Sequence, residues 1–465
     1  YIDGHFREEV LRALDAFIYI GALYDIEIVF TFFAFTPPLF EGVNPYLDPR
    51  SVAAQKRFIA AVAERYKNVK RLHYDLINEP SLFDPKRAFQ GPRTCGDEYE
   101  RRRFAEWLEK RYGTIEALRE AWEMPANLLA GFEDVKPPEP WEINHSPVFD
   151  SYKNFNGLRA VDYADFCSDA FNDWAREMKK VINSIQPAQM VTVGQDEGNT
   201  SQRPNGLHYG NVTDYTTTHP WWMLDDLLYD TVFAKHPYKP VLAQETGIMR
   251  QERPDGYSKR TETEMMELLE KKYGYAFAGA GAGAVQWIWN VNYFMNNANE
   301  SSIGAKRADG SEKPEIKVTE NFSRFMADVG PLMVERQPDR IAVVFPFSND
   351  GSNRRYSLRS TTKAAQVLAY YVRLPFYALS EYHLDALPDL RPGLVIVPSP
   401  YIFDDDAFEN LLRYVSDSGS TVLWTGPLAY GKHYEFLNRG EGIFGEIERA
   451  SLSRIELVNI NGKEY

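Results

Sequence analysis

The feature that most constrains the fold is a regular alternation of helix-like and strand-like segments. Residues 8–24 place apolar side chains at helical spacing, and residues 26–33 that follow are β-branched and aromatic. A second helical pattern over 51–66 precedes a short apolar run over 71–77. Parallel strands need a long crossover between them, usually a helix, so this alternation is typical of β/α architecture. The sequence therefore predicts a parallel sheet covered by helices.

The alternation continues to about residue 335 and gives six predicted strands. After an insertion over about 83–158 and a helix over 160–186, the remaining strands are expected at 190–194, 213–218, 240–244 and 284–289. Six strands are two fewer than a closed (β/α)8 barrel, or TIM barrel, contains. We expect such a barrel over residues 1–335, with its first two strands preceding Tyr1. An open doubly wound sheet is the alternative.

A second series of strands and helices begins near residue 338. It consists of a strand at 340–345, a helix at 361–372, a strand at 393–397, a helix at 404–417 and a strand at 420–425. This pattern predicts a small flavodoxin-like, doubly wound α/β domain over residues 338–465. The chain is thus expected to form two domains, with any catalytic apparatus in the barrel.

Charge and composition exclude several classes of protein. The chain has 52 Lys and Arg residues against 66 Asp and Glu, a net charge of −14, which is opposite to what a nucleic-acid-binding protein shows. The most apolar stretch, 16–35, contains Asp25 and Glu27, so a membrane span is not expected. Two cysteines exclude a disulfide scaffold and a cysteine-rich zinc site. No convincing phosphate loop is present, which argues against a nucleotide-using transferase.

Two glutamates follow predicted strands in the same way and form the central functional signal. Asn78-Glu79-Pro80 ends one strand, and Gln244-Glu245 ends another three β/α units later. The carboxyl ends of barrel strands carry the active site, so these carboxylates can face each other. Retaining glycosidases use such a pair, one as acid/base and one as nucleophile. Glu79 fits the acid/base role, Glu245 the nucleophile, and Asn78 a hydrogen bond to the sugar 2-hydroxyl, with no cofactor or metal required.

Other strand ends carry side chains suited to holding a sugar. His219 and Trp221 lie together at one strand end, and Gln195 ends another, followed by Asp196 and Glu197. His219 can bond the nucleophile or a hydroxyl, and an indole can stack on a sugar ring. Trp287 and Trp289 lie two residues apart on a predicted strand and would share one face. Structural roles are the alternative throughout: helix-capping glutamates, core tryptophans and a solvated loop at Gln195.

These motifs resemble clan A glycoside hydrolases, whose barrels carry Asn-Glu on strand four and Glu on strand seven. The segment Phe104 to Leu118, with Ala121-Trp122 after it, is similar to the one that follows strand four in family 42 β-galactosidases. The run Asp162 to Phe166 matches as well. The resemblance implies a retaining exo-β-glycosidase acting on a glycoside or oligosaccharide. It also implies a second domain that mediates a homotrimer, and it favours a cytoplasmic location, with a periplasmic one left open because the chain does not begin with Met.

The chain departs from family 42 around the expected sugar pocket. Pro80 follows the acid/base where the family usually has an aromatic residue, and the nucleophile segment Gln244 to Ile248 is not typical. The segment around His219 and the segment 304–311 differ too. A β-galactosidase is therefore the first expectation, and a β-mannosidase or β-glucosidase of a sister family is the alternative. A noncatalytic glycan-binding barrel is the alternative from a different class.

Overall fold

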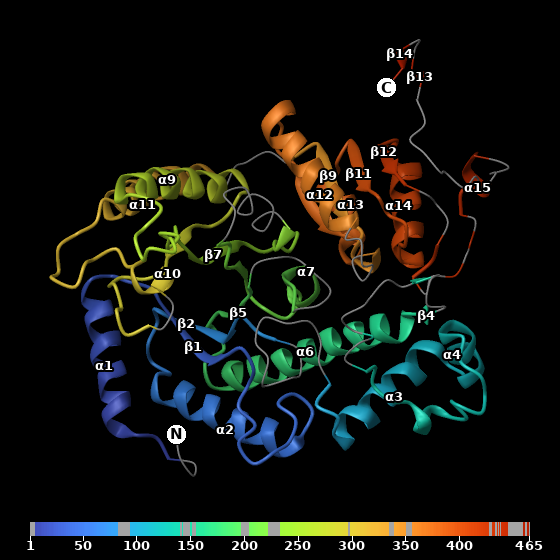
Figure 1. The fold of residues 1–465 in the computed structure, drawn as a ribbon, viewed down its shortest axis with the longest axis horizontal. Coiled ribbons are helices and arrows are strands. Elements are labelled where there is room, and N and C mark those ends of the chain that lie inside the picture. Colours follow the sequence, from blue (N-terminus) through green and yellow to red (C-terminus); the bar gives the residue numbers. More distant parts are fainter. Residues whose placement is uncertain are drawn as a thin grey trace.

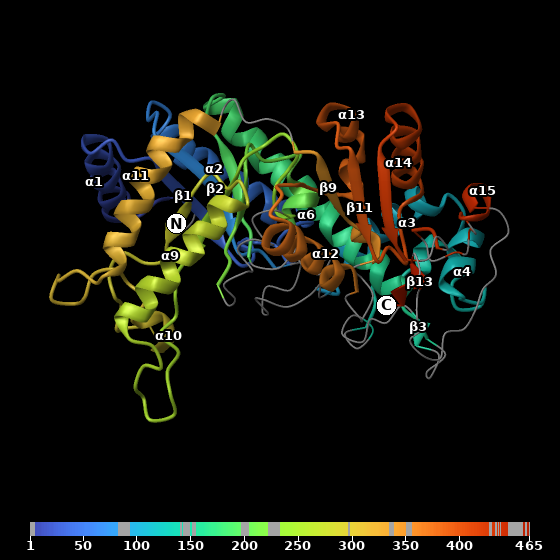
Figure 2. The same cartoon turned by 90° about the horizontal axis from the view of Figure 1, so that it is seen from above.

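The structure of the chain is a computed structural model. It describes residues 5–81, 94–139, 142, 149–150, 155–196, 204–221, 233–295, 298–333, 339–349, 356–426, 430–432, 435, 437, 439–444, 459–460 and 463–464. These residues form two α/β units that lie side by side (Figures 1 and 2).

The first unit contains six parallel strands. They are β1 (Ile28–Ala34), β2 (Leu72–Asn78), β5 (Val191–Gly194), β6 (Thr216–Thr218), β7 (Val241–Thr246) and β8 (Ala284–Gln286). They pair as β1-β2-β5 and β6-β7-β8. The two sheets meet at a parallel bridge between Asp196 and His219, and the Thr217 hydroxyl donates to the Val193 carbonyl at 2.6 Å. The six strands therefore run side by side in chain order, as the sequence predicts, and their carboxyl ends share one edge.

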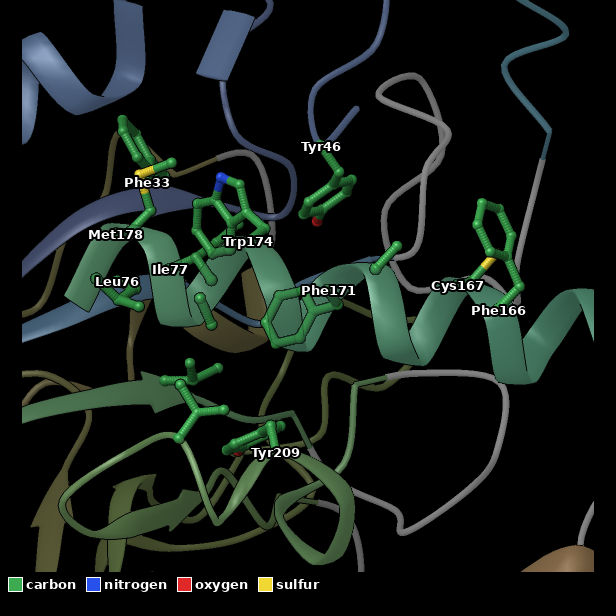
Figure 3. Packing of buried hydrophobic residues seen from close by; sticks show 14 of the residues in the cluster. Phe33, Tyr46, Leu76, Ile77, Phe166, Cys167, Phe171, Trp174, Met178 and Tyr209 are labelled. Atoms are coloured by element: carbon green, nitrogen blue, oxygen red, sulfur yellow. The ribbon is translucent and has the colours of Figure 1, made fainter. Parts of the chain in front are cut away.

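Helices cover the outer side of this row of strands. The main ones are α1 (Glu8–Leu23), α2 (Pro49–Arg65), α6 (Leu158–Ile185), α9 (Glu262–Ala278) and α11 (Glu315–Met333). Figure 3 shows Phe171 and Trp174 of α6 packed beside Phe33 and Ile77 of β1 and β2. This buried apolar cluster holds the strand ends in place, because removing a large core side chain costs several kcal/mol.

The predicted insertion separates β2 from α6. Its described elements are α3 (Glu98–Tyr112), α4 (Ile115–Trp122), η1 (Phe132–Asp134) and the antiparallel pair β3 (Phe149–Asp150) and β4 (Phe155–Asn156). Buried Asp162 of α6 anchors it by accepting hydrogen bonds from Tyr112 at 2.8 Å and Trp122 at 2.7 Å. The family-like segment at 104–122 is thus packed onto α6. Short helices α7 (Gly206–Tyr209) and α10 (Ala298–Ser301) lie in the loops after β5 and β8.

The second unit is a four-stranded parallel sheet. Its strands are β9 (Ile341–Phe345), β10 (Tyr377–Ser380), β11 (Leu394–Pro398) and β12 (Thr421–Thr425), in the order β10-β9-β11-β12. The helical segments are η2 (Phe347–Asn349), α12 (Tyr356–Gln366), the π-helical turn η3 (Val367–Val372), η4 (Glu381–Ala386), α13 (Leu387–Leu390), α14 (Asp405–Ser418) and α15 (Glu441–Phe444). A short hairpin of β13 (Asn459–Ile460) and β14 (Lys463–Glu464) follows. Strand β10 was not among the predicted strands, and the predicted helix at 361–372 begins earlier, at Tyr356.

The two units contact each other through buried aromatic and histidine side chains. Phe233 packs against Phe345 with ring centroids 6.2 Å apart, and His236 lies against His383 at 5.0 Å. Burial lowers the pKa of His236 to about 4 and that of His383 to about 3, because an imidazolium is poorly solvated there. Over the described residues, no helix has the combination of length and apolar character that crossing a membrane requires.

Candidate active site

The end of β2 holds Glu79 beside the ends of its two neighbouring strands. The Asn78 carbonyl accepts a hydrogen bond from Phe35 N, just after β1, at 2.8 Å. Glu79 N donates to the carbonyl of Gly194, the last residue of β5, at 2.6 Å. Glu79 adopts a φ of +46°, a left-handed conformation that non-glycine residues rarely take. Its carboxylate is buried, with the side chain 10% exposed.

Glu245 lies near the end of β7, across from Glu79. Its Oε1 accepts a hydrogen bond from Trp221 Nε1 at 3.1 Å, so the indole that follows β6 orients the carboxylate. Trp221 is itself held by Lys272, a fully buried lysine of α9. The Lys272 ammonium donates to the Trp221 carbonyl at 2.9 Å and to the Gly247 carbonyl at 3.0 Å.

His219 joins the two glutamates into one cluster. Its Nδ1 lies 3.1 Å from Glu79 Oε1 and 3.8 Å from Glu245 Oε2. An oxygen of each carboxylate and a ring nitrogen of His219 all lie within 4.8 Å of one another. The structure therefore brings Glu79, His219 and Glu245 together from three different strand ends.

The electrostatics of the cluster are set by burial and by the opposite charge at its centre. Burial raises the pKa of Glu245 to about 7, with the nearby Glu79 charge adding to the effect and His219 opposing it. Burial alone would lower the pKa of His219, but its hydrogen bond to Glu79 and the charges of Glu245, Glu79 and Asp75 together raise it. The arrangement thus favours a charged imidazolium between two carboxyl groups.

Another carboxylate, Asp75 of β2, lies close to this cluster. It is fully buried and accepts hydrogen bonds from Thr31 of β1 at 2.9 Å and from the Gln244 amide of β7 at 3.0 Å. Neither Asp75 nor Lys272 is among the predicted site residues. For Asp75 the available signal is a charged residue inside the short apolar run 71–77, since a buried charge needs specific partners.

The other predicted site residues lie in different surroundings, and not all of them lie beside the two glutamates. Gln195 is buried, and its side-chain oxygen accepts from Tyr209 at 3.0 Å and from the Gly206 backbone, which indicates a structural role. The prediction that Trp287 and Trp289 share a strand is wrong, because β8 ends at Gln286. Trp289 is 61% exposed and lies against Lys306, whereas the Trp287 carbonyl lies close to Gly247. Glu197 lies outside the described residues.

Within the part of the chain that the structure describes, two groups of side chains have the spacing of metal ligands. One is Glu79, His219 and Glu245, and the other is Cys95, Asp97 and Glu100 in the insertion. In the second group the carboxylates already have structural hydrogen bonds: Asp97 caps α3, and Glu100 accepts hydrogen bonds from Thr94 and Gly96. Paired carboxylates with an imidazole can also perform acid–base and nucleophilic chemistry without a metal.

Known proteins match this chain over part of its length. A family model described as β-galactosidase, of glycoside hydrolase family 42, matches residues 50–224, which include Glu79 and His219. A β-galactosidase of Thermus thermophilus is 30% identical over 140 residues, covering 30% of this chain and 19% of that protein. The match thus spans about a fifth of that relative.

Solved structures resemble the chain more extensively. A cold-adapted β-galactosidase from Rahnella sp. R3 superposes with a TM-score of 0.71 at 14% identity, covering 93% of this chain and 65% of that one. A family 42 exo-carrageenase from Bacteroides ovatus gives a TM-score of 0.64 at 16% identity, covering 84% and 54%. The chain thus resembles the glycoside hydrolases of family 42 in sequence over residues 50–224, and its fold resembles theirs over most of its length.

Proposed function

We propose that the protein is a retaining exo-β-glycosidase that hydrolyses terminal β-linked sugars. The observation that carries this proposal is the pair of carboxylates largely shielded from solvent, with one oxygen of Glu79 within 4.8 Å of one oxygen of Glu245. Retaining enzymes hold their carboxyl groups about 5–5.5 Å apart, whereas inverting enzymes leave about 6.5–9.5 Å for a water molecule. The close spacing supports direct attack by a carboxylate on the sugar.

In the proposed reaction, Glu245 is the nucleophile and Glu79 the acid/base. The Glu245 carboxylate attacks the anomeric carbon as the glycosidic C–O bond breaks, and Glu79 gives its proton to the departing oxygen. A water molecule then loses a proton to Glu79 and attacks the same carbon. The ester bond to Glu245 breaks, releasing the sugar with its original anomeric configuration.

His219, Trp221 and Asn78 would support these steps. An imidazolium 3.8 Å from Glu245 stabilises the ionised nucleophile, and the Trp221 hydrogen bond orients it. Asn78 precedes the acid/base at the end of β2, where its amide can bond the sugar 2-hydroxyl. Trp287 is the better candidate for a sugar platform, because its carbonyl lies beside Gly247, two residues after the nucleophile.

The first substrate expected is a β-galactoside, which is supported by the description of the matching family. A β-mannoside or β-glucoside is the alternative, because the chain departs from family 42 around His219 and Glu245. We further propose that the six strands belong to an eight-stranded (β/α)8 barrel and that the second unit is flavodoxin-like and mediates a homotrimer. Light scattering coupled to size-exclusion chromatography tests the oligomer.

The decisive experiment measures hydrolysis of nitrophenyl β-galactoside, β-mannoside, β-glucoside and β-fucoside by the protein and three variants. Glu245→Ala should abolish turnover, and Glu79→Ala should lose it but recover on activated substrates when azide is added. Glu252→Ala, on the loop after β7, is the matched control and should remain active. Full activity of either glutamate variant would refute the assignment. Tight sugar binding by the unmodified protein without turnover would indicate a glycan-binding barrel instead.

A further inference from the structure

We propose that Asp75 is a positioning residue for the proposed glycosidase reaction: it ties together the strands that carry Glu79 and Glu245 and places a buried carboxyl group beside His219. The inference rests on the proposed function. It concerns a residue that does not touch the substrate but acts through its neighbours.

Asp75 is bound by donors from four strands. Its Oδ2 accepts from the Thr31 hydroxyl of β1 at 2.9 Å and from the Gln244 amide of β7 at 3.0 Å. Its Oδ1 accepts from Ile77 N of β2 at 3.1 Å and from Gly194 N of β5 at 2.8 Å. Burial raises the pKa of Asp75, whereas these hydrogen bonds and the charge of His219 lower it. An ionised carboxylate offers about four acceptor sites and no donor, so the four bonds match the charged form.

These bonds end at the residues that hold the catalytic pair. Gln244 immediately precedes Glu245, and Ile77 lies two residues before Glu79. The Gly194 carbonyl accepts a hydrogen bond from the Glu79 N–H, and the Gly194 N–H donates one to Asp75. Through these bonds the Asp75 carboxylate fixes the register of β2, β5 and β7 relative to one another where they reach the site. A misplacement of about 1 Å in such a constellation can reduce the rate about 100-fold.

The charge of Asp75 is also close to the imidazole. A Cβ atom built on Gly194 would lie 2.8 Å from Asp75 Oδ2 and 3.3 Å from His219 Cε1, so both side chains pack against this glycine. Among the described residues, the titratable groups that act on His219 are Glu79 directly after β2, Glu245 of β7 and Asp75 of β2.

The titratable neighbours of Asp75 among the described residues include His219 after β6, Tyr209 of α7 and Tyr215 beside β6. Burial raises the pKa of both tyrosines, and the Asp75 charge raises them further, so they stay neutral near pH 7. His219 is therefore the cation that the buried Asp75 charge stabilises. A charged His219 in turn favours the ionised form of Glu245 that the first step requires.

The test is Asp75→Asn, which keeps the shape of the side chain and removes its charge. The pH dependence of kcat/KM is measured on the best nitrophenyl glycoside, and the imidazole of His219 is titrated by NMR without substrate, using His219→Gln to assign its signal. We expect kcat to fall about 100-fold. We also expect a narrower pH profile, with the His219 titration moved down by about one to two pH units, as expected for removing a nearby buried charge.

Two controls separate this role from a general loss of structure. Asp162→Asn removes another buried carboxylate, in α6, and should lower stability without moving the pH profile or the His219 titration. Gln244→Leu removes one bond to Asp75 but leaves its charge, and should lower kcat with the His219 titration unchanged. Gln186→Leu is its matched control, a buried glutamine that also bonds β2, through Tyr74 at 2.7 Å.

The outcomes are distinct. An unchanged His219 titration in Asp75→Asn overturns the electrostatic role, and equal kcat losses in Gln244→Leu and Gln186→Leu overturn the positioning role. If Asp75→Asn does not fold, the comparison of the two glutamine variants decides the positioning role. If the unmodified protein hydrolyses none of the glycosides, the proposed function fails, whereas the His219 titration still tests the link to Asp75.

Discussion

The partly buried carboxyl group of Glu245, the proposed nucleophile, should destabilise the folded protein, and replacing it should therefore increase stability. Burial raises the pKa of Glu245 from its ordinary 4.5 to about 7. The folded protein thus binds this proton more tightly than the unfolded chain does. The free energy of unfolding that this tighter proton binding contributes is fully present below pH 4.5 and is lost as the pH rises through about 7.

The size of the effect follows from the two pKa values. A tenfold change in an equilibrium constant is about 1.4 kcal/mol, so the change from 4.5 to about 7 corresponds to about 3 kcal/mol at pH 8. Glu245→Gln keeps an oxygen that can accept from Trp221 but never ionises. We therefore expect it to raise the free energy of unfolding by up to about 3 kcal/mol at pH 8 and to have no such effect below pH 4.5.

The assay is urea-induced unfolding of the unmodified protein and Glu245→Gln at a series of pH values from 4.5 to 8.5. Glu267→Gln, an exposed substitution of the same kind on α9, is the control and should leave stability unchanged at every pH. A Glu245→Gln variant that is no more stable at pH 8, or whose gain grows as the pH falls, would refute the reasoning.

Three further predictions concern the surroundings of the site and the contact between the units. Gly194→Ala would place its Cβ 2.8 Å from Asp75 Oδ2, so we expect a loss of about 1–3 kcal/mol in urea unfolding together with reduced kcat. Trp221→Phe removes the hydrogen bond that lowers the pKa of Glu245 and should move the acidic limb of the kcat/KM profile to higher pH; a limb that stays in place contradicts this. Burial lowers the pKa of His383 from 6.5 to about 3, so the folded protein resists protonation of this imidazole. The stability that the neutral imidazole contributes above pH 6.5 is therefore lost as the pH falls towards 3. His383→Phe should weaken the dependence of Tm on pH over that interval.

Most of the first unit could be predicted from the sequence because its strands are short apolar runs separated by helical patterns. The second unit was harder at one place. Strand β10, Tyr377–Ser380, has only four residues and no β-branched side chain, so its local pattern does not distinguish it from a loop. It is a strand because it pairs with β9, and this pairing joins residues far apart in the sequence, so the local pattern does not reveal it.

The cluster of Glu79, His219 and Glu245 could be predicted in part for a related reason. Glu79 and His219 each follow a strand and Glu245 lies at the end of one, and the geometry of parallel sheets brings such residues to one edge. Asp75 and Lys272 could not be found this way, because each lies inside an element. Lys272 follows another lysine on a charged helix, where a solvated side chain is the ordinary interpretation, and only the fold shows that it is fully buried.

The backbone at Glu79 has a consequence for how this chain could change. A residue other than glycine in the left-handed region, here at φ +46°, costs roughly 1–2 kcal/mol. A chain selected for stability alone would therefore favour glycine at this position. In a gene duplicate that is no longer selected for catalysis, we therefore expect Glu79 to be replaced early. Such a duplicate would gain stability as it lost turnover, so the residue found at position 79 would indicate whether catalysis or stability had been selected.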